Sequence, residues 1–322
     1  MVIERLISLV EDDFAAVNAI VTIKNKSQID LIEKLSHHIV QSGGKRLRPL
    51  LVLLSSHVFN YQGKEHIQLA AMIEFFHTAT LLHDDVIDDS TLRRGQETAN
   101  EIWGNKASIL VGDYLFTQSV QLTVGIQNWK IMNLLADMAH RISCAEITQL
   151  SNRNNPSLSI SEYLAVIQSK TALLFASAVS IGAILSETTD NMQNSIYNYG
   201  LHLGNAFQLI DDLLDYCPND CNIGKNIGDD LADGKATMPL LYAFEHGTPK
   251  QQEIIRFSLQ QGGLQYLDDI LNAINTTNAI QYTRDFAAQE IDKSINALQI
   301  LPDSIYKTAL HDLANFVLER SY

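Results

Sequence analysis

The sequence predicts an all-α protein, and three observations support that prediction. Apolar residues recur at helical spacing along most of the chain, strand-type alternation is absent, and the apolar stretch over residues 70–82 contains neither Gly nor Pro. We expect helices over residues 2–22, 28–40, 50–59, 64–89, 106–125, 128–151 and 192–215, and an apolar helix that begins at residue 170. Beyond residue 250 we expect amphipathic helices, with turns at 262–263 and 301–303.

The borders of these helices follow recognisable turn and cap signals. Ser42-Gly43-Gly44 interrupts the helical pattern before the helix at 50–59, and the polar loop 152–156 ends the helix at 128–151. Ser159 and Ser161 can then cap the next helix, which has Glu162 in its first turn. The segment 224–239 is punctuated by glycines and separates the helix at 192–215 from the C-terminal helices.

Length and composition are those of one globular domain. The chain has 322 residues, of which 46% are hydrophobic and 19% charged, and no linker or low-complexity segment divides it. We therefore expect a single domain over residues 1–322. The net charge of -14 argues against a nucleic-acid partner, although local cations and metal ions can still create an anion site.

Cysteine usage and hydropathy indicate a reducing cytoplasm and no membrane span. The three cysteines, Cys144, Cys217 and Cys221, do not form the paired spacing of a zinc site. The N-terminus lacks the pattern of a signal peptide. The most apolar stretch, Ala172–Leu185, is too short to cross a bilayer, and we interpret it as a core helix.

A cluster of carboxylates ends the apolar helix at 64–89. Four acidic residues stand within six positions, and Asp84, Asp85 and Asp88 fall within about 100° of the helix surface. His77 and Thr80 lie on the same face, one to two turns earlier. Two such carboxylates about 6 Å apart repel by roughly 3 kcal/mol at an effective dielectric of 20, so a solvated helix end or a bound cation would stabilise them. The apolar surroundings favour a cavity that holds Mg²⁺.

The same Asp-Asp-x-x-Asp pattern returns near the end of the helix at 192–215. Asp211, Asp212 and Asp215 again follow an apolar helical run. One copy is weak evidence of a metal site, whereas two copies at the ends of two core-type helices are difficult to explain as solvated surface. The sequence therefore predicts two metal-binding acidic motifs.

Basic residues follow glycines, follow the first acidic motif or stand beside the start of apolar helices. They are Lys45, Arg48, Arg93, Arg94, Lys170, Lys225 and Lys235. Glycines beside Lys and Arg at a helix start suit anion binding, and Arg binds phosphate in a bidentate manner. An ordinary turn with solvated charge also explains the first group, simple counter-ions explain Arg93 and Arg94, and Lys170 could extend along an apolar surface.

Together these features predict a pocket that binds a metal-bound diphosphate at its mouth and a hydrocarbon in its depth. No Ser/His/Asp or Cys/His nucleophile set is evident. The chemistry that fits is ionisation of an allylic diphosphate, because Mg²⁺ and cations stabilise the leaving group and a dry cavity shields a carbocation.

The chain resembles the trans-polyprenyl diphosphate synthases over nearly its whole length. The resemblance is carried by GGKRLRP at 43–49, HDDVIDDSTLRRG at 83–95, VGDYL at 111–115, KT at 170–171, QLIDDLLD at 208–215 and GKNIGDDLADGKATMPL at 224–240. Within the family it is most similar to the bacterial octaprenyl diphosphate synthases, which supply the quinone side chain. The resemblance implies an all-α bundle around a deep central cavity, a cytoplasmic homodimer and a membrane-destined lipid product.

The resemblance also implies a role for each matching residue. The diphosphate of isopentenyl diphosphate would be held by Lys45, Arg48, His77 and Arg94. The allylic diphosphate would be held by Arg93, Lys170, Thr171, Gln208, Lys225 and Lys235. Two or three Mg²⁺ ions would be bound by Asp84, Asp85, Asp88, Asp211, Asp212 and Asp215, and these aspartates with Lys170 and Lys235 form the catalytic set. The released diphosphate would accept the proton lost after condensation.

Product length follows from the residues before the first acidic motif. In the family, aromatic residues four and five positions before the first aspartate close the pocket, whereas here Ala79 and Thr80 are small and predict a long product. Leu122, Thr123 and Met132 are candidates for a deeper floor. The chain departs from the family pattern at Ala145, where relatives often carry Gly, and no expected ligand changes as a result.

Two other functions fit part of the pattern. A terpene cyclase of the same fold typically keeps only one strict aspartate motif and does not consume isopentenyl diphosphate. A non-catalytic regulatory subunit usually lacks aspartates that are all present here. The sequence leaves open the allylic primer and a product length of roughly seven to ten isoprene units.

Overall fold

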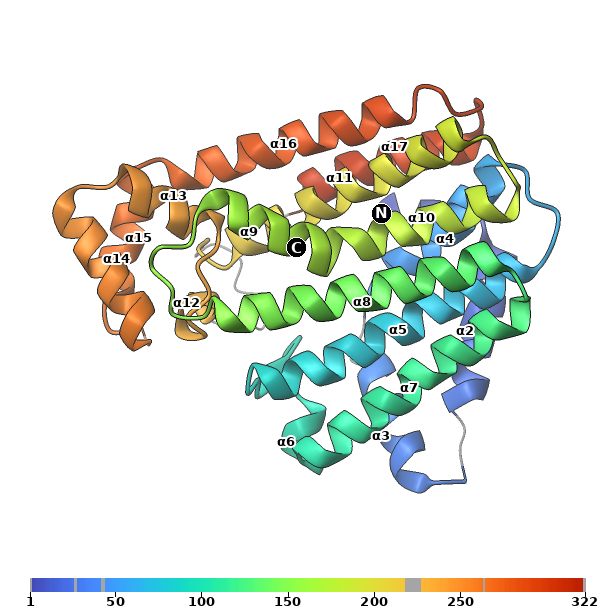
Figure 1. Ribbon diagram of the computed structural model, residues 1–322, viewed down its shortest axis with the longest axis horizontal. Helices are drawn as coiled ribbons and strands as arrows, with labels where there is room; N and C mark the ends of the chain where they lie inside the picture. The colour runs from blue at the N-terminus through green and yellow to red at the C-terminus, as the bar shows by residue number, and fades with distance from the viewer. Residues whose placement is uncertain (1, 26–27, 42–43, 218–226, 263, 321–322) are drawn as a thin grey trace. The chain divides into compact units, whose positions relative to one another are not determined.

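The computed structural model describes residues 2–25, 28–41, 44–217, 227–262 and 264–320, and it confirms the all-α fold (Figure 1). In these residues the only sheet is a two-stranded antiparallel ribbon between β1 (Leu92–Arg93) and β2 (Gln96–Glu97), which pairs Leu92 with Glu97. The chain divides into two compact units. Unit 1 comprises Met1–Met138, Leu174–Asn198 and Ala297–Leu313, and unit 2 comprises Ala139–Leu173, Tyr199–Asn296 and Ala314–Tyr322. The expectation of a single domain over residues 1–322 stays a prediction.

The helices lie close to the predicted ranges. The first half of the chain forms α1 (Val2–Ser8), α2 (Glu11–Asn25), α3 (Asp30–Gln41), α4 (Leu47–Val58), α5 (Glu65–Ile87), α6 (Ala99–Trp103), α7 (Asn105–Ile126) and α8 (Trp129–Ser151). The second half forms α9 (Ile160–Ile167), α10 (Leu173–Leu185), α11 (Asp190–Leu214), α12 (Asp229–Ala232), α13 (Met238–His246), α14 (Pro249–Gln261), α15 (Leu267–Thr276), α16 (Ala279–Ala297) and α17 (Ile305–Leu318).

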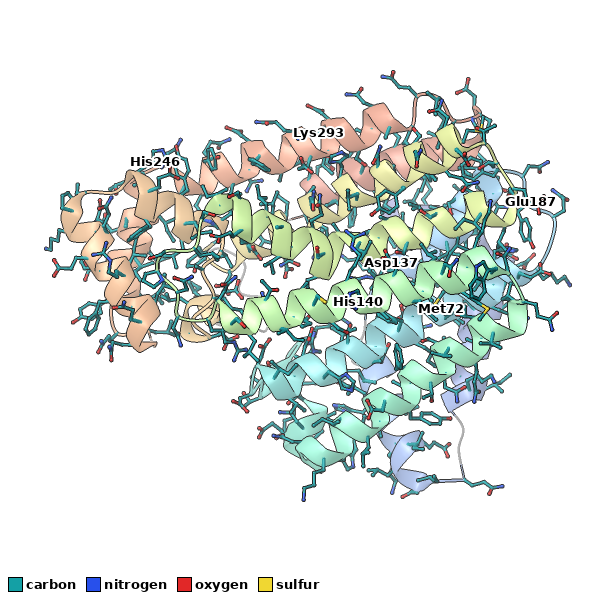
Figure 2. The ribbon with its side chains drawn as sticks, viewed as in Figure 1. Met72, Asp137, His140, Glu187, His246 and Lys293 are labelled. Carbon is teal, nitrogen blue, oxygen red and sulfur yellow. The ribbon has the colours of Figure 1, made fainter. Side chains whose placement is uncertain are left out.

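Unit 1 is built around α5. This helix packs against α2, α4 and α7, and Figure 1 shows α5 and α7 side by side. Its core side chains are almost completely buried, as Met72 illustrates with 1% exposure (labelled in Figure 2). The helix ends where Asp88 forms its C-cap and Asp89 adopts a left-handed backbone with a φ of 47°. The first acidic motif therefore occupies the last turn of a buried helix.

One predicted helix is interrupted in the structure. Residues 2–22 were expected to be continuous, but α1 and α2 are separated by a turn at Leu9 and Val10. The Val10 N–H donates to the Ile7 carbonyl at 3.0 Å, which closes the turn. Neither Gly nor Pro stands at this break, and the helical spacing of apolar residues continues through it. The sequence pattern therefore contained no signal of the turn.

In unit 2 a short π-helix, Gln168–Ala172, directly follows α9. Ser159 caps α9 as predicted, because its side chain accepts from the Glu162 N–H and the Glu162 carboxylate accepts from the Ser159 N–H. The π-turn places Lys170 and Thr171 in the interior of a helical segment rather than at its start.

Buried polar contacts join α11 to α16 in unit 2. The Glu290 carboxylate accepts hydrogen bonds from His202 and Asn205 of α11, each at 2.8 Å, and from Lys293 at 2.7 Å. Lys293 lies on α16 and is labelled in Figure 2. Because α11 also carries the second acidic motif, this cluster supports the helix that presents those aspartates.

The apolar segment that contains α10 is longer than the sequence predicted. The helical residues Ile160–Leu185 form a 26-residue stretch, and its most apolar window has a mean hydropathy of 1.6. The run Ala172–Leu185 is too short to cross a membrane by itself, but it continues a helical segment that is long enough to do so. Within that window 72% of the residues are buried, which agrees with a core helix, and core helices of this length meet the same criterion.

Candidate active site in two units

The first acidic motif lies at the end of α5, beside the β1–β2 ribbon. Asp85 is 1% exposed and accepts three hydrogen bonds from Arg93, with Nε at 3.0 and 3.1 Å and Nη2 at 2.7 Å. Asp84 and Asp88 are partly exposed. The structure thus brings Arg93 against the motif, as expected, but pairs it with a carboxylate that the sequence assigned to Mg²⁺.

Several cations surround His77, one turn before Thr80 on α5. The Arg48 Nη1 lies 2.9 Å from the His77 Nε2, and the guanidinium of Arg48 also stacks 4.7 Å from the ring centre of Phe175. Burial and the nearby charges of Arg48, Arg93 and Arg94 lower the pKa of His77 well below its usual value. His77 is therefore neutral, and the positive charges around it form a site suited to an anion.

The start of α4 and the loop after the first motif also meet. The Arg94 guanidinium lies against the backbone of Gly44, where a Cβ atom would come within 2.8 Å of its Nη1. Lys45 is exposed beside this contact. The structure thus places Arg94 beside Gly44, and the shared ligand that the resemblance implied for Lys45, Arg48 and Arg94 stays a prediction.

Glu74 is a carboxylate within this basic group. Burial raises its pKa, while the charges of Arg46, Arg48 and Arg94 oppose that rise. Arg46 Nε lies 3.9 Å from the Glu74 carboxylate. Sequence reasoning gave neither Arg46 nor Glu74 a role, although Arg46 lies in the GGKRLRP segment and Glu74 lies one turn before His77.

The residues expected to set product length lie on α5, α7 and α8 within unit 1. Ala79 is 2% exposed, and Thr80 donates a hydrogen bond to the His77 carbonyl at 2.8 Å. Leu122 and Thr123 are buried on α7, and Met132 lies in the first turn of α8. Their function as a wall and floor stays a prediction.

The second acidic motif ends α11 in unit 2, and two of its aspartates are buried. Asp212 is 4% exposed and accepts from the Tyr163 hydroxyl and, at 2.7 Å, from the Gln208 amide. Burial and the charge of Asp230 raise the pKa of Asp212 to about 8, against the effect of those two hydrogen bonds. Asp215 is 7% exposed and accepts from the Asp230 N–H at 3.2 Å.

This arrangement meets the requirements of a hard divalent cation. Asp212 and Asp215 are buried, and the charge of Asp230 disfavours ionisation of Asp212. A bound cation would reverse that effect. Because the donors are all carboxylate oxygens, they fit Mg²⁺ better than a metal that prefers nitrogen or sulfur.

A pocket in unit 2 collects five of the predicted residues. It is lined by Lys170, Thr171, Gln208, Asp212 and Lys235, together with Tyr163, Asp230, Arg153 and the apolar Leu158, Val166 and Ile167. Thr171 donates to the Gln208 Oε1 at 2.9 Å, which links the π-helix to α11. A Cβ at Gly204 would lie 2.4 Å from the Ala172 Cα, so only glycine permits this close approach.

The cations of this pocket lie next to acidic and amide partners. Lys170 donates to Glu146 and Gln149 of α8, both at 2.7 Å. Lys235 donates to Asp233 at 3.0 Å and is 15% exposed at its side chain. The predicted ligand Lys225 lies outside the described residues.

Asp211, the first aspartate of the second motif, has a buried cation nearby that the sequence did not identify. The Arg320 Nη2 is 3.9 Å from an Asp211 oxygen, and its guanidinium stacks 4.2 Å from the Phe207 ring centre. Sequence reasoning missed Arg320, Tyr163 and Asp230 because their contacts depend on tertiary structure. For Asp230 the Gly-Asp-Asp sequence near the motif was an available signal, whereas none pointed to Tyr163.

Comparisons with known proteins agree with this geometry. The family model described as Polyprenyl synthetase matches residues 29–275. The chain is 43% identical to the octaprenyl diphosphate synthase of Escherichia coli strain K12 over 321 residues, and this aligned region covers 99% of each chain. It is 37% identical to the geranyl-diphosphate-specific all-trans-nonaprenyl-diphosphate synthase of Rhodobacter capsulatus, with 98% of each chain covered. Among solved structures, a polyprenyl synthase from Caulobacter crescentus CB15, complexed with calcium and isoprenyl diphosphate, superposes with a TM-score of 0.95 at 38% identity, covering 99% of this chain and 98% of the other.

Proposed function

Since this chain belongs to the polyprenyl synthetase family and is a prenyltransferase, we propose that it adds isopentenyl diphosphate units to an allylic diphosphate and releases an all-trans polyprenyl diphosphate. The observation that carries this proposal is the group of arginines around a neutral His77, beside the first acidic motif. A diphosphate is the anion that such a group suits, because guanidinium groups bind phosphate oxygens in pairs.

In unit 1 we assign the diphosphate of isopentenyl diphosphate to the basic group. Arg48 and Arg94 would neutralise its charge, with Lys45 at the exposed edge. The neutral His77 would add a hydrogen bond without further charge. Arg93 is proposed as a ligand of the allylic diphosphate from the resemblance alone, and that role would require it to leave Asp85, whose buried carboxylate it neutralises.

In unit 2 we assign the allylic diphosphate to the pocket around Lys170. Thr171 and Gln208 would donate hydrogen bonds, Lys235 would supply charge, and Lys225 is proposed from the resemblance alone. The apolar residues of the pocket would exclude water from the developing carbocation. After condensation, the released diphosphate would take the proton.

Mg²⁺ is the metal proposed for both acidic motifs. In unit 1 its ligands would be Asp84, Asp85 and Asp88, and in unit 2 Asp211, Asp212 and Asp215. When bound, Mg²⁺ would neutralise the charge that the leaving diphosphate develops. The residues themselves would fix the position of that charge, since Tyr163 and Gln208 hold the Asp212 carboxylate in one orientation.

The product is proposed to be octaprenyl diphosphate, which serves as a quinone side chain, and the enzyme to be a cytoplasmic homodimer. The relative with 43% identity is an octaprenyl diphosphate synthase, and the small Ala79 and Thr80 would leave the hydrocarbon pocket open. The apolar side chains exposed on α7 favour self-association. Leu110 is 66% exposed, Val124 50%, and Phe116 37%.

The decisive experiment is turnover by the purified chain alone. With Mg²⁺, farnesyl diphosphate and labelled isopentenyl diphosphate, we expect labelled polyprenyl products that chromatography after dephosphorylation resolves by length. Asp212→Asn should abolish most turnover, whereas the control Asp269→Asn, an exposed residue of the same unit, should not. A cyclase would leave the isopentenyl diphosphate unconsumed, and a regulatory subunit would be inactive alone.

A further inference from the structure

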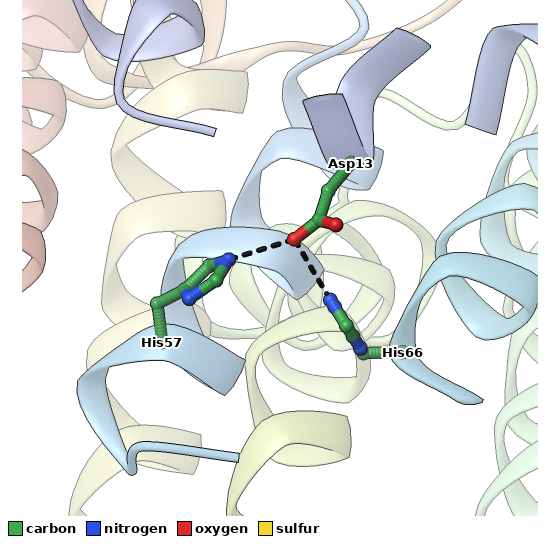
Figure 3. A group of neighbouring side chains, drawn as sticks. All are labelled: Asp13, His57 and His66. Atoms are coloured by element: carbon green, nitrogen blue, oxygen red, sulfur yellow. Dashed lines mark hydrogen bonds and ion pairs between the residues drawn. The ribbon is translucent and has the colours of Figure 1, made fainter. Parts of the chain in front are cut away.

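A second group of potential metal ligands lies in unit 1, away from both acidic motifs. Asp13 of α2, His57 of α4 and His66 of α5 converge, and Figure 3 shows both imidazole rings directed at the Asp13 carboxylate. His57 Nε2 lies 2.7 Å and His66 Nε2 lies 2.9 Å from the same oxygen, Asp13 Oδ2. His66 and Asp84 stand at opposite ends of α5, about 27 Å apart along the helix axis. The proposed prenyl transfer therefore gives this cluster no role.

The three donors match the preferences of zinc rather than magnesium. Two imidazole nitrogens and one carboxylate oxygen form a common set of protein ligands for Zn²⁺, which leaves its fourth position for water. Mg²⁺ prefers oxygen donors only. The donor types alone would therefore direct zinc to this cluster and magnesium to the acidic motifs.

The observed spacing requires little movement to accommodate the ion. Zinc lies about 2.0–2.2 Å from nitrogen and oxygen ligands, so tetrahedral ligand atoms are roughly 3.3 Å apart. The three donor atoms already lie within 4.8 Å of one another, and the two N···O distances would need to lengthen by only about half an ångström. The protons that the imidazoles now donate to Asp13 would be released when the ion binds.

Packing fixes the orientation of both imidazole rings. The His57 ring stacks on Tyr306 with the ring centres 4.7 Å apart, and the edge of Tyr61 meets the His66 ring at 5.7 Å. His66 is 4% exposed. Its Nδ1 has no hydrogen-bond partner among the described residues, so Nε2 is the ring atom that the fold directs to a polar partner.

Access and position are also appropriate. The side chains of Asp13 and His57 are 24% and 28% exposed, which leaves a route for an ion and space for a water ligand. The Asp13 carboxylate lies against both imidazole rings, so it is positioned to share an ion with them.

We infer that Asp13, His57 and His66 form a binding site for a zinc-class divalent cation that joins the ends of α2, α4 and α5. Such an ion would stabilise unit 1, since it binds ligands from three helices that are assembled only in the folded chain. It would be independent of the proposed reaction, because His66 and Asp84 are about 27 Å apart along α5.

Calorimetric titration of Zn²⁺ into the full-length chain without an affinity tag tests this inference. The buffer holds a constant excess of Mg²⁺, so that the acidic motifs are already saturated. We expect one strong site per chain and a rise in the thermal unfolding midpoint on addition of Zn²⁺. His57→Gln should weaken binding by at least roughly tenfold and remove that rise, because even loss of an outer partner of a ligand costs about 10–100-fold.

Glutamine at position 57 separates metal binding from the existing hydrogen bond, because its amide can still donate to Asp13. His37→Gln is the matched control, since His37 is an exposed histidine of the same unit and should leave the affinity unchanged. His66→Gln is a second variant of the site. If it does not fold, His57→Gln alone decides the outcome, since His57 is partly exposed. Equal affinity in wild type and His57→Gln, or no binding at all, would overturn the inference. Co²⁺ can be used in place of Zn²⁺ as a spectroscopic probe. A thiolate charge-transfer band in the Co²⁺ spectrum would place the ion on a cysteine and would also overturn the inference.

Discussion

The clearest quantitative prediction concerns Glu290, the buried carboxylate that joins α16 to α11. Burial acts to raise its pKa, but hydrogen bonds from His202, Lys293 and Asn205 outweigh burial and lower the pKa to about 2. A change from the usual 4.5 to about 2 corresponds to roughly 3 kcal/mol of stabilisation, at about 1.36 kcal/mol for each tenfold change in the acid constant. We expect Glu290→Gln to lose about this amount of unfolding free energy at pH 7.

The pH dependence of that loss has a definite sign. A carboxylate whose pKa is lowered by folding stabilises the protein above its unfolded value, and the contribution disappears as the pH falls through the folded value. The difference between wild type and Glu290→Gln should therefore be full above about pH 5 and decline between pH 4.5 and about 2.

Urea unfolding followed by circular dichroism, at several pH values from 7 to 3, measures this difference. Glu253→Gln is the matched control because Glu253 is exposed on α14 of the same unit, and its effect should stay within about 0.5 kcal/mol. If Glu290→Gln were as stable as the control at pH 7, or if its deficit did not change down to pH 3, the hydrogen-bonded carboxylate would not be the source of the stability.

Three further predictions address the active site and the assembly. Thr80→Tyr should shorten the product, as chromatography of the dephosphorylated lipid would show, and an unchanged length would remove Thr80 from the proposed wall. Tyr163→Phe removes a hydrogen bond to the buried Asp212 and should lower kcat/KM by roughly tenfold or more without changing the circular dichroism spectrum, whereas wild-type kcat/KM would contradict the positioning role. Leu110→Glu places a charge on the exposed apolar face of α7 and should reduce the sedimenting mass to that of a monomer, and an unchanged mass would exclude this face from the dimer contact.

Long helices were predictable because their side-chain pattern extends over many turns. The range 64–89 predicted α5 to within a few residues, and Ser159 marked the start of α9 through its capping box. The turn at Leu9 was not predictable, since the apolar spacing continues across it. Short elements such as α6 and α12 contain too few residues to show a period, and their form depends on the segments around them.

In the site, residue types were predictable but pairings were not. The acidic motifs and the KT pair stand out locally in the sequence. However, the partner of Lys170 is Glu146, which is 24 residues away, and the hydroxyl on Asp212 comes from Tyr163, which is 49 residues away. Such pairs form when helices pack, so a single sequence carries no direct signal of them. The pairing of Arg93 with Asp85 similarly required the β1–β2 ribbon that turns the chain back toward α5.

The distribution of charge in each unit indicates the kind of ligand that it would bind. In unit 1, burial and the charges of Arg48, Arg93 and Arg94 lower the pKa of His77, so the site gains stability from an added anion. In unit 2, burial and Asp230 raise the pKa of Asp212, so that site gains stability from an added cation. Like charges held close together in a folded protein cost free energy unless binding relieves the repulsion. A magnesium diphosphate supplies both signs of charge. The repulsion between like charges in each unit is therefore what binding of the substrates would relieve.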